Sequence, residues 1–280
     1  MLYPDAHTNT QGDDYVNSHS GDVDWITGRH PWPWHVSYCG DFDIVGHAKP
    51  QSVYRRVLWG VEPMGLLVHG PSPHEELPVP WTPNAFNWNW PDEVDSWTWP
   101  AAAEGELVGV RVFVRGCESA RLTLNGRVLG TAPVQANLTA VFTVPYSPGN
   151  LEASCVNGTA VLPGISASLQ TAGEAAALVL SADRRTIRHD PNDLSFVPVM
   201  LEASVFSASG LRVPTAAVDV TFAVSGAGQL VAVGSGDPSD LGSFTASEHT
   251  KWRGRALAVL QPLTSRCFTG RCFTAARSRS

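Results

Sequence analysis

The chain has 280 residues, a formal net charge of −7 and an isoelectric point of about 5.7. Nucleic acids and anionic membranes attract basic surfaces, so this acidic balance disfavours both as main partners. No apolar run reaches the roughly 18 residues that a membrane-spanning helix needs. The first residues also lack the basic-then-apolar layout of a signal peptide, which leaves the compartment open because the natural start could lie upstream.

Residues 1–30 are polar and show no sustained period, which predicts loop or disorder. The next stretch, 32–60, is dense in aromatic, acidic and basic side chains. Its DFDIVGH segment (41–47) has a short apolar centre between turn residues and predicts a buried strand. Pro50 then precedes apolar residues at helical spacing, Val53, Tyr54, Val57 and Leu58, which predicts a short helix.

Residues 61–100 are rich in proline and tryptophan, and the prolines forbid long regular elements. From residue 107 the pattern changes to alternating apolar and polar positions, as in LVGVRVFV. Asn125-Gly126 lies between two short strand-like runs and predicts a type I′ hairpin turn. Further strand patterns, with a second Asn-Gly at 157–158, predict a first β-sandwich over residues 61–165.

A second set of strand patterns follows the LQTAGEAAA segment, which we interpret as a linker. The runs ALVLSAD, FVPVMLEASVF, DVTFAVSG and RALAVLQP predict strands, and SGAGQLVAVGSGDP predicts a glycine-rich loop system. Their number and spacing predict an immunoglobulin-like sandwich over residues 170–263. Residues 264–280 repeat RCFT and then become basic, which indicates an appended tail.

The number and spacing of the cysteines do not identify a disulfide framework or a metal site. There are five, Cys39, Cys117, Cys155, Cys267 and Cys272, with no CxxC pair, so we expect buried or free thiols. A disulfide between Cys267 and Cys272 is the alternative. We expect no metal and no other cofactor, since no histidine has finger-like spacing and no phosphate loop or dinucleotide motif is present.

Asp41 and Asp43 would share one face of a strand, where they could hold a cation or bind sugar hydroxyl groups. We prefer a structural reading, in which one aspartate caps the neighbouring turn and the other pairs with Arg55 or Arg56. Sugar sites join aromatic rings to carboxylates, and Trp32, Trp34 and Asp41 fit that chemistry. For the tryptophans at 81–99 we prefer a structural role.

The stretch WPWHVSYCGDFDIVGHAKPQSVYRRVLWG resembles the end of the (β/α)8 barrel in glycoside hydrolase family 2, of β-galactosidase type. The later motifs WPDEVDSWTWP, VRVFVRGCESARLTLNGRVLG and VTFAVSGAGQLVAVGSGDPSD resemble the two following sandwich domains, in family order. The resemblance covers roughly residues 30–262. It implies a mainly β chain, with two immunoglobulin-like sandwiches preceded by a remnant of a (β/α)8 barrel over residues 1–60, which we expect to be poorly ordered or packed against the first sandwich.

The family's mechanism is a retaining one that uses two glutamates. The resemblance places both upstream of the matching region, and no glutamate precedes Glu62 in this chain. We therefore expect no catalytic residue here, and the resemblance supplies only Trp32, Trp34 and Asp41 as substrate-binding candidates. The partner it implies is a β-galactoside or related carbohydrate in the full-length context. The alternatives are a carbohydrate-binding protein without catalysis and a structural module that docks onto a separately encoded barrel.

Overall fold

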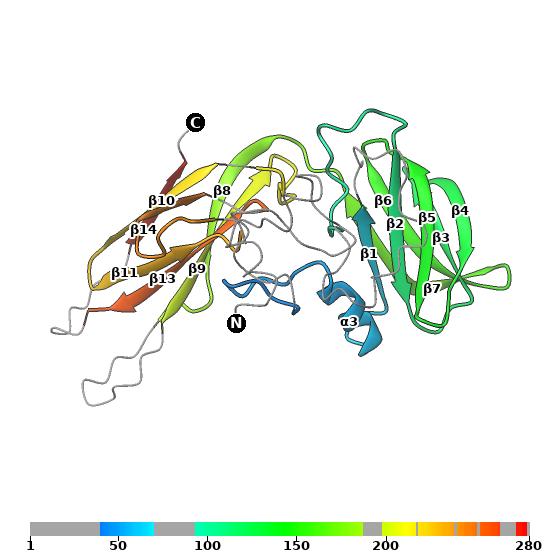
Figure 1. The fold of residues 1–280 in the computed structure, drawn as a ribbon, viewed down its shortest axis with the longest axis horizontal. Coiled ribbons are helices and arrows are strands. Elements are labelled where there is room, and N and C mark those ends of the chain that lie inside the picture. The colour runs from blue at the N-terminus through cyan, green and yellow to red at the C-terminus, as the bar shows by residue number, and fades with distance from the viewer. Residues whose placement is uncertain are drawn as a thin grey trace, which may run out of the picture. The chain divides into compact units, whose positions relative to one another are not determined.

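The computed structural model describes residues 40–69, 93–186, 198–216, 218–237, 240–250, 253–263 and 273–278. The chain divides into two compact units, one with residues 1–43 and 47–171 and the other with residues 44–46 and 172–280. Each unit contains two antiparallel β-sheets, so the predicted mainly β fold is confirmed (Figure 1). Within the described ranges, no helix has the length and apolar character needed to cross a membrane.

The first unit pairs a three-stranded sheet with a four-stranded sheet. The three-stranded sheet has the order β1-β2-β5, with β1 at Met64–His69, β2 at Leu107–Val114 and β5 at Thr139–Pro145. The four-stranded sheet has the order β4-β3-β6-β7, with β4 at Arg127–Pro133, β3 at Ser119–Leu124, β6 at Asn150–Asn157 and β7 at Ala160–Gln170.

The core of the first unit lies between these two sheets. Alternate residues of β2, from Val108 to Val114, face it together with Leu122 of β3 and Leu151 of β6. All are buried, as the alternation predicted. Because both sheets contribute to one apolar cluster, the unit is a sandwich.

The helix α3 (Ser52–Leu58) covers the other face of the three-stranded sheet, beside β1 (Figure 1). Val53 and Val57 are buried against Leu67 of β1 and Phe113 of β2. The valine spacing thus predicted the helix and its buried face correctly, although Leu58 is largely exposed. The outer face of β2 is therefore buried as well as its inner face.

The hairpin between β3 and β4 has the predicted turn. Asn125 and Gly126 have φ values of 52° and 79°, as a type I′ turn requires. The Asn125 side chain anchors the turn to the start of β6, because its Oδ1 accepts the Asn150 N–H at 2.9 Å and its Nδ2 donates to the Pro148 carbonyl at 3.0 Å. The short sequence signal was sufficient here because the turn is local.

The second unit pairs the sheet β12-β10-β14 with the sheet β11-β13-β9-β8. The strands are β8 (Ala175–Ala182), β9 (Val199–Ser207), β10 (Asp219–Ser225), β11 (Gly228–Gly234), β12 (Glu248–Thr250), β13 (Arg255–Pro262) and β14 (Phe273–Ser278). Leu201, Phe222, Val233 and Ala258 contribute to a core between the two sheets, which makes this unit a second sandwich.

Two segments of the second unit differ from the sequence prediction. Gly228–Gly234, predicted as part of a glycine-rich loop, forms β11 and pairs with β13. Part of the 264–280 segment, interpreted as a tail, forms β14 and pairs with β10. The linker is also shorter than predicted, since β7 ends at Gln170 and β8 begins at Ala175.

The expectation of free thiols is wrong for two of the cysteines. Cys117 and Cys155 form a disulfide in the first unit, with their Cα atoms 5.7 Å apart. The pairing joins residues 38 positions apart, so the sequence spacing carried no signal for it. Cys39, Cys267 and Cys272, and with them the suggested tail disulfide, lie outside the described residues.

Candidate functional site

The segment that carries Asp41 forms a tight turn and no regular strand. Phe42 and Ala48 make an isolated antiparallel bridge, and the Asp43 N–H donates to the His47 carbonyl at 2.9 Å. Phe42 is 63% exposed. The prediction of a buried strand over DFDIVGH is therefore wrong, because Gly46, with a φ of 86°, closes a turn directly after the apolar residues.

Asp41 is held by the helix that follows it. Its Oδ1 accepts a hydrogen bond from the Arg55 guanidinium on α3, and this ion pair is only partly exposed. The Asp41 backbone carbonyl also accepts the Lys49 N–H at 2.7 Å. The carboxylate is thus fixed in orientation. Its remaining lone pairs give it the chemistry of a positioned acceptor for a hydroxyl group.

Asp43 has a different task. Its Oδ1 accepts the His47 N–H at 2.8 Å, and its Oδ2 lies 3.7 Å from the His47 Nδ1. Asp43 therefore caps the turn while Asp41 pairs with Arg55, which confirms the structural reading of the two aspartates. Among the described residues, no group of three or more histidine, cysteine or acidic side chains is arranged to hold a metal ion.

The other two predicted site residues, Trp32 and Trp34, lie outside the described residues. Asp41 is therefore the one substrate-binding candidate for which the structure gives contacts. Its binding of a sugar stays a prediction.

The tryptophans at 81–99 can be assessed at two positions. Trp97 is fully buried, its Nε1 donates to the Ser147 carbonyl at 2.9 Å, and its ring lies 5.1 Å from that of Tyr146. Trp99 is partly buried and packs against the same core. The structural role predicted for the cluster is confirmed for these two, while Trp81, Trp88 and Trp90 lie outside the described residues.

Trp59 is an exposed aromatic residue that the sequence reasoning did not single out. It ends α3 and is 69% exposed. The Gly60 N–H donates to the Val57 carbonyl at 3.0 Å, and the Val61 N–H donates to the Arg56 carbonyl at 2.8 Å. This pair of bonds is a Schellman motif, which fixes the backbone that carries the Trp59 ring.

Charged groups flank Trp59. The Nε of Arg56 lies 2.9 Å from the Oε1 of Glu62, and both side chains are more than a third exposed. Arg115 donates to the Leu58 carbonyl at 3.2 Å. An accessible aromatic ring can bind the apolar face of a ligand. The sequence signal was the Leu-Trp-Gly end of a helix, which places a large apolar side chain at the exposed terminus.

Two family models match this chain. Residues 178–268 match glycoside hydrolase family 2 C-terminal domain 5. Residues 105–162 match a domain of unknown function, DUF4982. The first match runs from β8 past β13 in the second sandwich, and the other spans β2 to β6 in the first sandwich.

Individual relatives agree with these matches. Beta-galactosidase BoGH2A of Bacteroides ovatus is 27% identical over 231 residues, which are 82% of this chain and 23% of that protein. The crystal structure of a glycosyl hydrolase family 2 member from Bacteroides cellulosilyticus has a TM-score of 0.73 at 32% identity, and the match covers 86% of this chain and 30% of that one. A beta-glycosidase from Bacteroides vulgatus shares the fold at 20% identity, with a TM-score of 0.65 over 90% of this chain and 28% of that one. The chain thus spans less than a third of the length of these relatives.

Proposed function

Because the chain carries the carboxy-terminal portion of a glycoside hydrolase of family 2, we propose that it serves the hydrolysis of β-glycosidic bonds, with β-galactosides as the first substrates to test. The observation that carries this proposal is the pair of family matches, which fall on the two sandwiches in the order that the sequence resemblance predicted. The substrate class rests on the printed activity of the Bacteroides ovatus relative.

We propose further that the 280-residue chain by itself does not catalyse this reaction. A retaining glycosidase needs two carboxyl groups about 5 Å apart that flank the scissile bond. Three of the described acidic side chains already have structural partners. Asp41 pairs with Arg55, Glu62 pairs with Arg56, and Glu93 is buried against Arg111. No glutamate precedes Glu62 in the sequence.

In this proposal Asp41 binds substrate rather than reacting with it. The carboxylate that Arg55 orients would accept a hydrogen bond from a sugar hydroxyl group, and Trp32 and Trp34 would stack on apolar sugar faces. The catalytic carboxyl groups would come from a further segment of a longer chain or from a second polypeptide of the same enzyme.

Two measurements test the proposal together. An antibody raised against the purified chain should capture activity on an aryl β-galactoside from an extract of the source organism. The captured protein should be larger than 30.0 kDa or should contain a second polypeptide. Capture of the protein without any glycosidase activity on a panel of aryl β-glycosides would contradict the proposed function.

The purified chain is then assayed alone on the same substrates. We expect no turnover above that of a heat-denatured sample. Turnover that disappears in the Asp41→Asn or Glu62→Gln variant would show that the chain has its own catalytic groups, and would overturn the second part of the proposal.

A second candidate function is carbohydrate binding without catalysis, which the exposed Trp59 favours. The backbone hydrogen bonds that follow Trp59 and the exposure of its ring give it the chemistry of a sugar-binding platform. Affinity electrophoresis in gels that contain β-linked polysaccharides should retard the chain, and Trp59→Ala should abolish the retardation. The control is Val128→Ala, which truncates another exposed apolar residue of the same unit. Equal mobility of all three proteins in every gel would exclude this function.

A further inference from the structure

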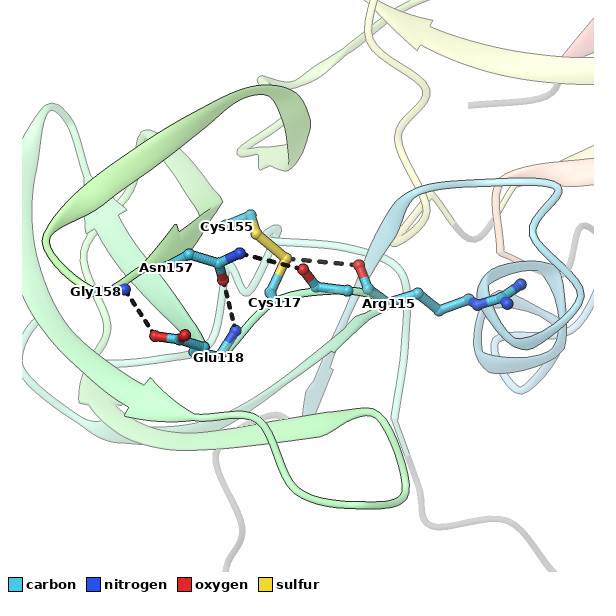
Figure 2. The surroundings of a disulfide bond; sticks show 7 residues. Arg115, Cys117, Glu118, Cys155, Asn157 and Gly158 are labelled. Atoms are coloured by element: carbon cyan, nitrogen blue, oxygen red, sulfur yellow. Dashed lines mark hydrogen bonds between the residues drawn. A yellow bond between two sulfur atoms is a disulfide. The ribbon is translucent and has the colours of Figure 1, made fainter.

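The disulfide of the first sandwich joins the crossover between its two sheets to the four-stranded sheet. Cys117 lies on the connection between β2 of the three-stranded sheet and β3, and Cys155 lies within β6 of the four-stranded sheet (Figure 2). The bond therefore fixes the point where the chain crosses from one sheet to the other. Neither family match assigns a role to this pair.

Strand pairing places the segment that carries Cys117 beside β6, which carries Cys155. In the pairing of β3 with β6, Ala120 lies opposite Cys155 and Ser119 lies opposite Val156. Cys117 is thus two residues before the start of a strand that β6 already holds in register. Gly116, with a φ of 71°, turns the chain toward this position.

Hydrogen bonds hold the same corner. The Asn157 Oδ1 accepts the Glu118 N–H at 2.8 Å, and the Glu118 Oε2 accepts the Gly158 N–H at 2.7 Å (Figure 2). The Asn157 Nδ2 also donates to the Gly116 carbonyl at 3.5 Å. These bonds join the residues on both sides of Cys117 to the end of β6, so they pre-position the two thiols for oxidation.

The two cysteines differ in burial. Cys155 is fully buried in the apolar core, whereas Cys117 is partly exposed at its edge. An external thiolate can therefore approach the bond only from the Cys117 side. The leaving group would then be a Cys155 thiolate inside the core, and burial in apolar surroundings disfavours the charged thiolate. The folded domain thereby resists reduction.

We propose that Cys117–Cys155 is a permanent structural disulfide, which closes when the first sandwich folds in an oxidising compartment such as a periplasm or an extracellular space. In its formation the two thiols lose two protons and two electrons. The acceptor is another disulfide, of a protein or small-molecule oxidant, which becomes a dithiol. Such bonds persist in oxidising compartments and are rare where glutathione and thioredoxin keep thiols reduced.

The oxidation state of Cys117 and Cys155 in the cell tests whether the protein folds in an oxidising compartment. Cells of the source organism are quenched in acid, free thiols are blocked with N-ethylmaleimide, and the captured protein is digested with trypsin without reduction. Cleavage after arginine separates Cys117, in peptide 116–121, from Cys155, in peptide 128–184. We expect these peptides to be recovered cross-linked. Recovery of both with one maleimide each would show a reduced pair in the cell and would overturn the proposal.

The resistance of the folded protein to reduction is tested on purified protein in which Cys39, Cys267 and Cys272 are replaced by serine. Cys117 and Cys155 are then the only cysteines left. We expect millimolar dithiothreitol to release no maleimide-reactive thiol in native buffer, and to release two in urea. A release rate in native buffer that rises in proportion to dithiothreitol, while the circular dichroism stays that of the folded protein, would contradict a permanent cross-link. The Cys117→Ser variant is the control that should yield no cross-linked peptide in any condition.

Discussion

The side chain of Val53 occupies the space that a side chain on Gly65 would need. A β-carbon built on Gly65 would lie 2.3 Å from the Cγ1 of Val53, which is closer than real carbon atoms approach. The absence of a side chain at this position of β1 therefore lets α3 pack directly on the sheet. This contact joins α3 to the first sandwich.

We predict that Gly65→Ala destabilises the first sandwich by ~1–3 kcal/mol, the usual cost of overpacking in a core. The change in urea midpoint measures it. Gly130→Ala is the matched control, because Gly130 is also in a strand but has open space at its β-carbon position. An equal effect of the two substitutions would contradict the close packing of α3.

A buried ion pair lies on the same face of the sheet. Arg111 of β2 donates from both Nε and Nη2 to the carboxylate of Glu93, and both side chains are almost completely buried. We predict that Glu93→Leu or Arg111→Met alone costs ~3–5 kcal/mol, because each leaves one buried charge without its partner.

The double variant Glu93→Leu with Arg111→Met should recover most of that loss, because no uncompensated charge remains. A double-mutant cycle of urea denaturation measures the coupling. Additive losses in the cycle would show that the pair does not act as a unit.

The turn at Asn125 combines backbone strain with side-chain bonding. We predict that Asn125→Ala destabilises the protein by ~2 kcal/mol, because alanine disfavours the positive φ and removes the bonds to Asn150 and Pro148. Asn125→Gly should cost less, since glycine tolerates the same φ. If the glycine variant is the less stable of the two, the positive φ does not account for the cost of the alanine substitution.

Removal of the disulfide should be costly. The bond closes a loop of about 38 residues, for which chain entropy gives a stabilisation of about 4 kcal/mol. Cys117→Ser should therefore lower the free energy of unfolding by roughly that amount, and wild type in reducing buffer after refolding should match it. Equal denaturation curves for oxidised and reduced protein would contradict this prediction.

Asp183 at the end of β8 predicts a pH effect. Burial acts to raise its pKa, but hydrogen bonds from Arg184 and the Met200 N–H outweigh it and hold the pKa below the ordinary 3.8. A lowered folded-state pKa stabilises the fold above pH 3.8, and this contribution is lost as the pH falls through the folded-state value. The difference in urea midpoint between wild type and Asp183→Asn should be largest near neutral pH. It should vanish at a pH below the folded-state pKa of Asp183. A constant difference would mean that Asp183 acts through packing alone.

The sequence predicted the local features well. The β3–β4 turn needs only Asn-Gly, and α3 needs only a proline followed by apolar residues at helical spacing, so both were found. The alternation over β2 also revealed its inner face correctly.

The features that were missed depend on distant partners. Gly228–Gly234 has a glycine at each end, which indicated a loop, yet pairing with β13 makes it a strand. Cys117 and Cys155 meet only because β3 and β6 pair. In the candidate site, the pairing of Asp41 with Arg55 was one of the expected outcomes. The exposure of Trp59 was not predicted, because the exposure of an apolar side chain depends on which residues pack around it.

Because β2 is buried on both faces, the folding unit of the first sandwich begins before β1 and includes α3. A recombinant fragment cut at Met64 would keep every strand of the first sandwich but would strip α3 from Leu67 and Phe113. It would present a bare apolar sheet face to water and would aggregate more readily than a fragment cut at residue 40. The smallest fragment that should fold by itself is therefore α3 together with the first sandwich, and recombination between related proteins should keep the two together.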